Sequence, residues 1–367
     1  MKSNLFKLIP VLYFLLLLSV SARGQSFSKE NKIVRSFVLT NDTEIEITNK
    51  YGDINIESWD NDSIRIEINY KVTSTKESKL DKTFNAINFD FNANQYYIIA
   101  KTVFEGKGSF WTDVSDIANN MFAGGTYTSI DYTIYIPADK RINLTLKYGN
   151  VYMANYDGYF KLSLSNGDFK AHNLDGEVEL DITFGDATIN KIEDGKVKIS
   201  YGTFSLENSN KLSIIGQSAE FDLGVIDNLV IDSKRDKVTI EEIGDISGVT
   251  YFSRLVIDDV VYKLDLSTKY GSVKLKEISS KVKKVQLSSY STTVNMFFRN
   301  DYNYFISLTS NDKADVTYSA NMGEFKTKKL PGKENIMQAE CVIGEKNIAV
   351  PVVIDVKSGF VTLKIKD

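Results

Sequence analysis

Apolar and polar residues alternate in short segments along most of the chain, and this pattern predicts β-strands. The segment 177–195 is the clearest example, with Val178, Leu180 and Ile182 before Phe184-Gly185-Asp186, and Ala187 and Ile189 after it. Alternation with a period of two is typical of a strand that buries one face. Each strand of this kind needs a second apolar surface against which to pack.

The interruption between strands recurs as one short motif: an aromatic or polar residue, glycine, any residue, and an apolar residue. Its copies are Tyr51-Gly52-Asp53-Ile54, Tyr148-Gly149-Asn150-Val151, Asn166-Gly167-Asp168-Phe169, Phe184-Gly185-Asp186-Ala187, Tyr201-Gly202-Thr203-Phe204 and Tyr270-Gly271-Ser272-Val273. Between Gly149, Gly167, Gly185 and Gly202 the steps are 18, 18 and 17 residues. A fixed period indicates a repeat architecture.

We therefore predict an all-β fold, a parallel β-helix (β-solenoid) with rungs of about 17–20 residues. The left-handed hexapeptide helix needs an apolar residue every six positions, which this sequence lacks. An antiparallel sandwich or barrel is the alternative, although hairpin proteins do not repeat one corner sequence at constant spacing. Glycine at the corner suggests a positive φ at that residue.

The period is broken at 73–136 and again at 323–347. Within the first break, residues 74–86 and Trp111–Phe122 read as amphipathic helices, and residues 87–104 read as a hairpin. Because an open end of a stack of strands is a template for aggregation, we expect 73–136 to form a small α+β cap or insertion near the N-terminus. The stretch 323–347 is a second irregular segment before a final rung at 350–365. Residues 25–367 then form one domain.

Residues 1–24 have the pattern of a signal peptide: early lysines, an apolar run from Leu8 to Val20, and small residues before Gln25. Cleavage there changes the formal net charge from −4 to −7, because Lys2, Lys7 and Arg23 leave and no acidic residue does. We expect an exported protein of the periplasm, outer-membrane surface or medium, without a membrane span after cleavage. The acidic balance argues against nucleic acid as a partner.

The corners, the N-terminal signal and the phrase Tyr132-Thr133-Ile134-Tyr135-Ile136-Pro137-Ala138 leading into Leu144-Thr145-Leu146-Lys147-Tyr148-Gly149 resemble the "putative adhesin" family of bacterial envelope proteins. The resemblance covers roughly residues 40–367. It implies a parallel β-helix like the head domains of autotransporter adhesins, without a defined biochemical role. No catalytic residue belongs to the motif, so the resemblance assigns none.

Few residues suggest chemistry. His172 is the only histidine and lies in a turn, and Cys341 is the only cysteine, so a catalytic triad, a zinc site and an intramolecular disulfide lack their ligands or partners. Asp53, Asp168 and Asp186 follow the corner glycine, a place that we interpret as solvent-exposed. We therefore predict no catalytic, cofactor-binding or metal-binding residues and no cofactor.

Aromatic residues before the corner suggest a ladder of rings, formed by Tyr148, Phe184, Tyr201, Tyr251, Tyr270 and Tyr290. Phe184 continues the inward parity of Val178, Leu180 and Ile182, so we interpret the ladder as internal packing rather than a platform for sugars. The expected function is a non-enzymatic surface protein or adhesin that binds a glycan or a protein. The alternatives are a polysaccharide lyase or glycoside hydrolase on a β-helix, and a periplasmic sensory or assembly component.

Overall fold

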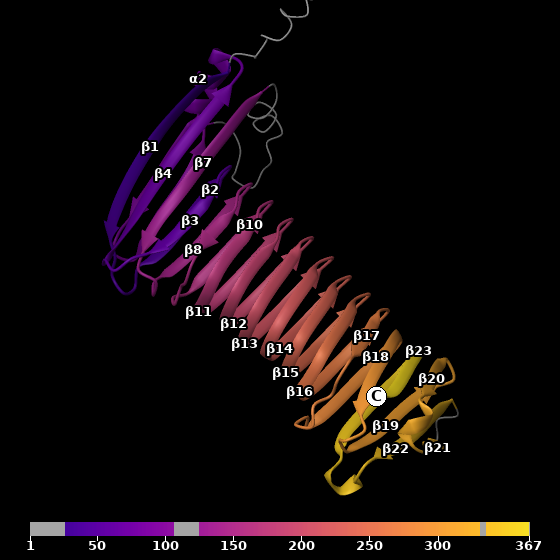
Figure 1. Ribbon diagram of the computed structural model, residues 1–367. Helices are drawn as coiled ribbons and strands as arrows, with labels where there is room; N and C mark the ends of the chain where they lie inside the picture. The colour runs from indigo at the N-terminus through magenta and orange to yellow at the C-terminus, as the bar shows by residue number, and fades with distance from the viewer. Residues whose placement is uncertain (1–25, 106–124, 331–334, 367) are drawn as a thin grey trace, which may run out of the picture.

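The structure is a computed structural model that describes residues 26–105, 125–330 and 335–366. These residues form an all-β protein with one α-helix, α2 (Glu77–Asn85), and two short 3₁₀ turns, η2 (Ala320–Met322) and η3 (Lys346–Ile348). The strands join in a single mixed sheet that extends along one axis (Figure 1). The predicted signal peptide (1–24) and the predicted helix Trp111–Phe122 lie outside the described residues.

The strands fall into three groups along the axis. The N-terminal group is β1 (Phe27–Val38), β2 (Glu44–Lys50), β3 (Ile54–Ser58), β4 (Ser63–Ser74), β5 (Ile87–Ala93), β6 (Tyr97–Phe104) and β7 (Thr126–Ile136). The middle group is β8 (Arg141–Lys147), β9 (Val151–Met153), β10 (Phe160–Ser165), β11 (Phe169–Thr183), β12 (Ala187–Ser200), β13 (Thr203–Gln217), β14 (Glu220–Lys234), β15 (Lys237–Tyr251), β16 (Arg254–Lys269), β17 (Ser272–Leu275) and β18 (Lys284–Arg299). The C-terminal group is β19 (Tyr304–Asn311), β20 (Ala314–Tyr318), β21 (Lys326–Lys329), β22 (Ile336–Ile343) and β23 (Val350–Lys366).

The middle group is a stack in which all pairings are parallel: β8 pairs with β10, β9 and β10 both pair with β11, and each strand from β11 to β17 pairs with the next. From β11 to β16 a strand runs from one corner to the following corner, and we call this segment with its corner a rung. Pairing in register places apolar residues over one another, as in the buried column Leu162, Leu180, Val197, Ile214 and Ile231. Each such side chain contributes about 1.5–3 kcal/mol when it leaves water. The apolar positions of the alternating segments in the sequence are therefore the residues that form this core.

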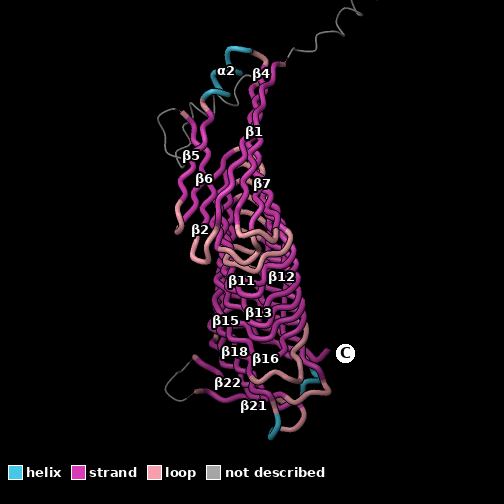
Figure 2. Tube along the Cα trace, turned by 90° about the vertical axis from the view of Figure 1, so that its left-hand side faces the viewer, coloured by secondary structure: helices cyan, strands magenta, loops and turns pink. Residues whose placement is uncertain are grey.

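Both ends of the sheet contain antiparallel pairs. At the N-terminal end β6 pairs with β2 and β7 pairs with β3, both in parallel, and β4 and then β1 follow β7 in antiparallel order. The predicted helix at 74–86 is confirmed as α2, and the predicted hairpin is confirmed as β5 and β6, which lie beside β2 in Figure 2. In the described part of the chain no helix is long and apolar enough to cross a membrane.

The C-terminal strand does not simply follow the rungs in chain order. β23 pairs in parallel with β18 on one side and with β19 and β20 on the other, so it lies between strands that precede it in the chain. The prediction of a rung at 350–365 is confirmed by the pairing of β23 with β18 on both sides of Gly359, but its place as the last rung is wrong, because β19 and β20 lie beyond it. Apolar alternation identifies a strand, but it does not identify the strand's neighbours.

The corners differ from the prediction in which residue has a positive φ. That conformation belongs to the residue before the glycine, for example Phe184 (58°) and Tyr201 (58°), whereas Gly167, Gly185 and Gly202 are not in the left-handed region. A side chain on Gly185 would overlap the carbonyl oxygen of Gly167 in the preceding rung. Glycine is therefore required for close approach between rungs, and not for a positive φ.

Aspartate and asparagine after the glycine connect one rung to the next. The backbone N–H of each such residue donates to Oδ1 of its counterpart one rung earlier: Asn150 to Asp53 (2.7 Å), Asp168 to Asn150 (2.9 Å), Asp186 to Asp168 (3.0 Å) and Thr203 to Asp186 (2.8 Å). The interpretation of these positions as solvent-exposed is confirmed for Asp186, whereas Asp53 and Asp168 are half-buried. All three carboxylates also accept a backbone N–H of the next rung, which the sequence did not indicate.

The acceptor column ends at Thr203, and the corner changes there. The N–H of Glu220 donates to the carbonyl of Gly202 (3.0 Å), and that of Lys237 donates to the carbonyl of Ala219 (3.0 Å). Ala219, Asp236 and Ser253 now occupy the glycine position. Once the backbone carbonyl accepts the next rung's N–H, residues with a β-carbon are accommodated, which explains why the motif degrades after residue 203.

We expect Gly185→Val to lower the free energy of unfolding by about 3 kcal/mol or more, because its side chain would overlap the backbone of Gly167. Ser310→Ala is expected to change the free energy of unfolding by less than about 0.5 kcal/mol, because the Ser310 side chain has no hydrogen bond in the described part of the chain. Thermal melts of the two variants test this. Equal melting curves would contradict the close approach at the corner.

We expect Asp168→Ala to destabilise the protein by about 0.5–1.5 kcal/mol, because the exposed N–H of Asp186 loses its acceptor. Asp168→Asn keeps an oxygen at the same place and should remain within about 0.5 kcal/mol of the wild type. Urea denaturation measures both variants. A loss of similar size in both would mean that charge, rather than the hydrogen bond, is what matters at this position.

Candidate functional site

The corners project a line of side chains outward along one edge of the stack. In the described residues, ten non-glycine residues have positive φ, and all lie at corners: Tyr51, Tyr148, Asn166, Phe184, Tyr201, Ser218, Arg235, Phe252, Tyr270 and Ser291. We call these the corner column. The backbone N–H of nine of them donates to a backbone carbonyl of the adjacent rung, as in Tyr201 to Gln217 (3.1 Å), and that of Ser291 donates to Ser358 Oγ (3.0 Å). This pairing offsets the roughly 1–2 kcal/mol that left-handed backbone costs a residue with a β-carbon.

The aromatic members of the corner column are exposed and stack in pairs. The ring centroids lie 5.4 Å apart for Tyr51 and Tyr148, 5.0 Å for Phe184 and Tyr201, and 4.9 Å for Phe252 and Tyr270, with interplanar angles of at most 15°. Phe184 is 55% exposed and Phe252 56%. Tyr51 is the exception, because it is buried beside Phe104.

The interpretation of this ladder as internal packing is therefore wrong. Inward and outward faces alternate only while the backbone is extended, and the left-handed residue at the corner reverses the parity. The predicted ladder also places Tyr251 and Tyr290 at corners, which is wrong by one residue. The corner positions belong to Phe252 and Ser291, and Tyr251 and Tyr290 precede them. A ladder of rings exists, but it lies on the surface.

The residue before each corner forms a second line beside the first. Strand pairing aligns Lys50, Lys147, Ser165, Thr183, Ser200, Gln217, Lys234, Tyr251, Lys269 and Tyr290, which we call the strand-end column. Three of its four lysines lie over rings: Lys50 Nζ is 4.9 Å from the centroid of Tyr51, Lys147 Nζ is 5.0 Å from that of Tyr148, and Lys269 Nζ is 5.5 Å from that of Tyr251. Neither column contains an acidic residue. We refer to the two columns together as the aromatic edge.

A groove opens at the C-terminal part of the aromatic edge. Its volume is about 510 Å³ and its lining residues are Tyr251, Ser267, Thr268, Lys269, Tyr270, Ser288, Ser289, Tyr290, Asp355 and Lys357. The rings of Tyr270 and Tyr290 meet edge to face at 5.3 Å. A hydrogen bond between the two phenols raises the pKa of Tyr270. The groove thus combines three tyrosines with hydroxyl groups and two lysines.

Polar side chains replace apolar ones in the layer beneath this groove. The inward position that holds Ile182 and Ile199 in earlier rungs holds Thr250, Thr268 and Ser289 here, and all three are buried. Thr250 and Thr268 share a hydrogen bond of 2.9 Å. In the described part of the chain, Ser289 Oγ has no partner. A buried hydroxyl without a partner is costly unless a ligand or water satisfies it.

The other candidates from the sequence do not assemble into a site. His172 is exposed and lines a separate shallow groove with Tyr152 and Lys170. Cys341 is buried, its thiol lies 3.3 Å from the carbonyl oxygen of Met322, and burial raises its pKa. Within residues 26–105, 125–330 and 335–366, no group of three His, Cys, Asp or Glu could hold a metal ion.

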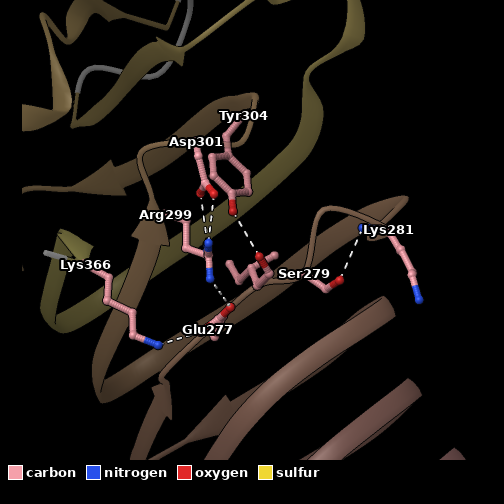
Figure 3. A network of polar contacts seen from close by, with 8 residues as sticks. Glu277, Ser279, Lys281, Arg299, Asp301, Tyr304 and Lys366 are labelled. Atoms are coloured by element: carbon pink, nitrogen blue, oxygen red, sulfur yellow. Dashed lines mark hydrogen bonds and ion pairs between the residues drawn. The ribbon is translucent and has the colours of Figure 1, made fainter.

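The densest charged cluster joins three C-terminal segments (Figure 3). Glu277 binds Lys366 at 2.5 Å and Arg299 at 3.1 Å, and Arg299 also binds Asp301 at 2.8 Å. Hydrogen bonding to Lys366, which outweighs the opposing effect of burial, holds the pKa of Glu277 below its ordinary value, and Arg299 adds to this. These four charges pair with one another, so the cluster ties the segment after β17 to the ends of β18 and β23.

Comparison with known proteins gives only remote similarities. No family model matches the chain, and no curated protein matches it. A solved structure described as a putative cell adhesion protein from Clostridium sporogenes ATCC 15579 is 11% identical, with a TM-score of 0.21, over 92% of this chain and 100% of that chain. Putative adhesins from Bacteroides fragilis NCTC 9343 and Parabacteroides distasonis ATCC 8503 are each 10% identical, with TM-scores of 0.26, over 92% and 93% of this chain and 97% and 98% of theirs. These values are too low to establish a shared fold.

The charged cluster predicts a pH dependence of stability. Because the pKa of Glu277 is lowered on folding, its contribution is present above the ordinary value of 4.5 and is lost as the pH falls through the lower folded value. Glu277→Gln should therefore lower the melting temperature at about pH 7 and make little difference at about pH 2. Glu207→Gln, at an exposed residue without an ion pair in the described part of the chain, is the control. A pH-independent difference for Glu277→Gln would contradict the role of its charge.

Proposed function

We propose that the protein is an exported, non-enzymatic envelope or surface protein that binds an external ligand along its aromatic edge, as an adhesin does. The observation that carries the proposal is the line of exposed, stacked rings flanked by lysines and ending in a groove. Exposed aromatic rings at this density on one edge are typical of a binding surface, because they bury large areas at a small cost in side-chain entropy.

We further propose that the stack of rungs is a parallel β-helix that acts as a rigid support for this edge. The parallel register from β8 to β18 and the steps of 18 or 17 residues between hydrogen-bonded corner residues support it. In this arrangement 73–136 and 323–347 would cover the two ends, where unpaired strand edges invite aggregation. Rigid spacing of identical corners gives the ligand a preorganised surface.

Binding without turnover distinguishes this function from that of an enzyme on the same support. A glycoside hydrolase needs a pair of carboxylates around the scissile bond, and neither column of the aromatic edge contains an acid. The purified protein should retain a ligand from a glycan array without releasing sugar from it. Sugar release would favour the enzyme, and absence of the protein from labelled intact cells would favour a periplasmic role.

We expect the double variant Tyr201→Ala/Tyr270→Ala to weaken binding to intact cells and to the array by at least about tenfold, because aromatic anchors dominate binding energy. Tyr262→Ala is the matched control, since Tyr262 is also exposed on β16 but lies far from the corner of that rung. Melting curves confirm that both proteins are folded. Equal binding by the wild type and the double variant would overturn the proposed function.

A further inference from the structure

Resting on the proposed function, we propose that the ligand is a linear anionic polysaccharide that lies along the aromatic edge. Its sugar rings would pack against the aromatic side chains, and its acidic groups would pair with the lysines and the arginine of the same edge. Four features of the structure lead to this class of ligand: the free ring faces, the charge of the edge, its length and the lining of the groove.

Ring faces remain available because small or flexible residues separate the aromatic pairs. Asn166 lies between Tyr148 and Phe184, and Ser218 and Arg235 lie between Tyr201 and Phe252. Tyr148, Phe184, Tyr201 and Phe252 each stack on one partner and have on their other side a rung whose corner residue carries no ring. Tyr51 and Tyr270 are different, because they also contact Phe104 and Tyr290. The electron-rich face of such a ring attracts the weakly positive C–H groups of a sugar. Rungs about 4.8 Å apart leave roughly one ring thickness beside each pair.

The charge of the edge is opposite to that of the protein as a whole. The chain has a formal net charge of −4, yet the two columns carry Lys50, Lys147, Lys234, Arg235 and Lys269 and no acid. Lys234, Arg235, Lys269 and the neighbouring Lys357 form no ion pair with the described residues. By contrast, several lysines on the adjoining faces pair with acids one rung away, as in Lys198 with Asp181 (2.9 Å). Two columns that carry cations and no acid favour an anionic ligand.

The length of the edge favours a polymer. From Tyr148 to Tyr270 the corner column advances seven rungs, or about 34 Å at the spacing of paired strands. A mono- or disaccharide would contact only one aromatic pair, whereas an extended chain parallel to the axis reaches all of the exposed pairs. Cations lie at the rungs of Lys147, Lys234 and Lys269 along this line, so such a chain would meet both rings and cations on one path.

The groove adds hydrogen-bonding groups at one end of this path. Ser267 and Ser288 line it beside the tyrosines, and the buried hydroxyl of Ser289, which has no partner among the described residues, lies in the same lining. Asp355 is the one acid in the groove and lies beyond the strand-end column, where it can accept from sugar hydroxyls. Lys269 and Lys357 leave the groove with a net positive charge. A sugar unit with hydroxyl and carboxylate groups matches this set.

The test compares each acidic polysaccharide with its own neutralised form. The purified full chain is titrated by calorimetry with polygalacturonate, alginate and hyaluronate, and with the methyl ester of each. We expect at least one acidic form to bind at least about tenfold more tightly than its ester, and its affinity to fall as salt rises. If no acidic form binds, or if acids and esters bind equally, the anionic class is wrong.

Variants separate this inference from the proposed function. Lys269→Ala/Lys357→Ala should weaken binding of the acidic form by about three- to thirtyfold and reduce its salt dependence, since each exposed charge pair contributes modestly. Lys284→Ala removes one charge at the far end of β18 and should have no effect. If the lysine variant binds normally while Tyr201→Ala/Tyr270→Ala abolishes cell binding, the ligand is not anionic but the binding function stands. If the tyrosine variant binds cells normally, the proposed function itself fails.

Discussion

The structure depends on neighbouring rungs keeping strand spacing all the way around each corner. A strand can pair with its neighbour only while both backbones stay about 4.8 Å apart, and a corner normally breaks that pairing. Here the pairing continues, because glycine lets backbones touch at Gly167 and Gly185 and because Asn150 and Asp168 accept the N–H that would otherwise be unpaired. The corner residue must then turn left-handed, and its side chain points outward. The exposed aromatic edge is thus a geometric consequence of close stacking.

Much of the fold could be predicted from the sequence, because the buried column and the repeated corner leave direct traces. Alternation such as Val178, Leu180 and Ile182 identifies the strands, and constant steps between glycines identify a stack. The place of β23 could not be predicted in this way. Its insertion between β18 and β19 depends on contacts that are distant in the chain, and a regular apolar pattern is equally compatible with an end position. A local sequence pattern predicts that a strand forms, but it does not predict which strands it pairs with.

The aromatic edge could be predicted only in part. The sequence shows aromatic residues such as Phe184 and Tyr201 recurring before glycine, but it does not show that they are exposed. The alternation of inward and outward side chains that holds up to Ile182 does not continue through a left-handed residue. A signal for that conformation was present. Asn166 occupies the same place, and asparagine tolerates positive φ better than most residues. The lysines were harder to recognise, since Lys147, Lys234 and Lys269 align only once the register of the strands is known.

Rigid corners also explain why a binding edge would form here rather than on the flat faces. On the faces, many acids and bases of adjacent rungs pair with one another, as Lys196 does with Glu177 and Glu179, so those side chains are already occupied. At the corner the backbone donors are satisfied by Asp168 and its equivalents, which frees the outward side chains from any structural task. Because each ring sits on a backbone fixed by both neighbours, little conformational entropy remains to be lost on binding. The same hydrogen bonds that hold the rungs together therefore preorganise the surface that they expose.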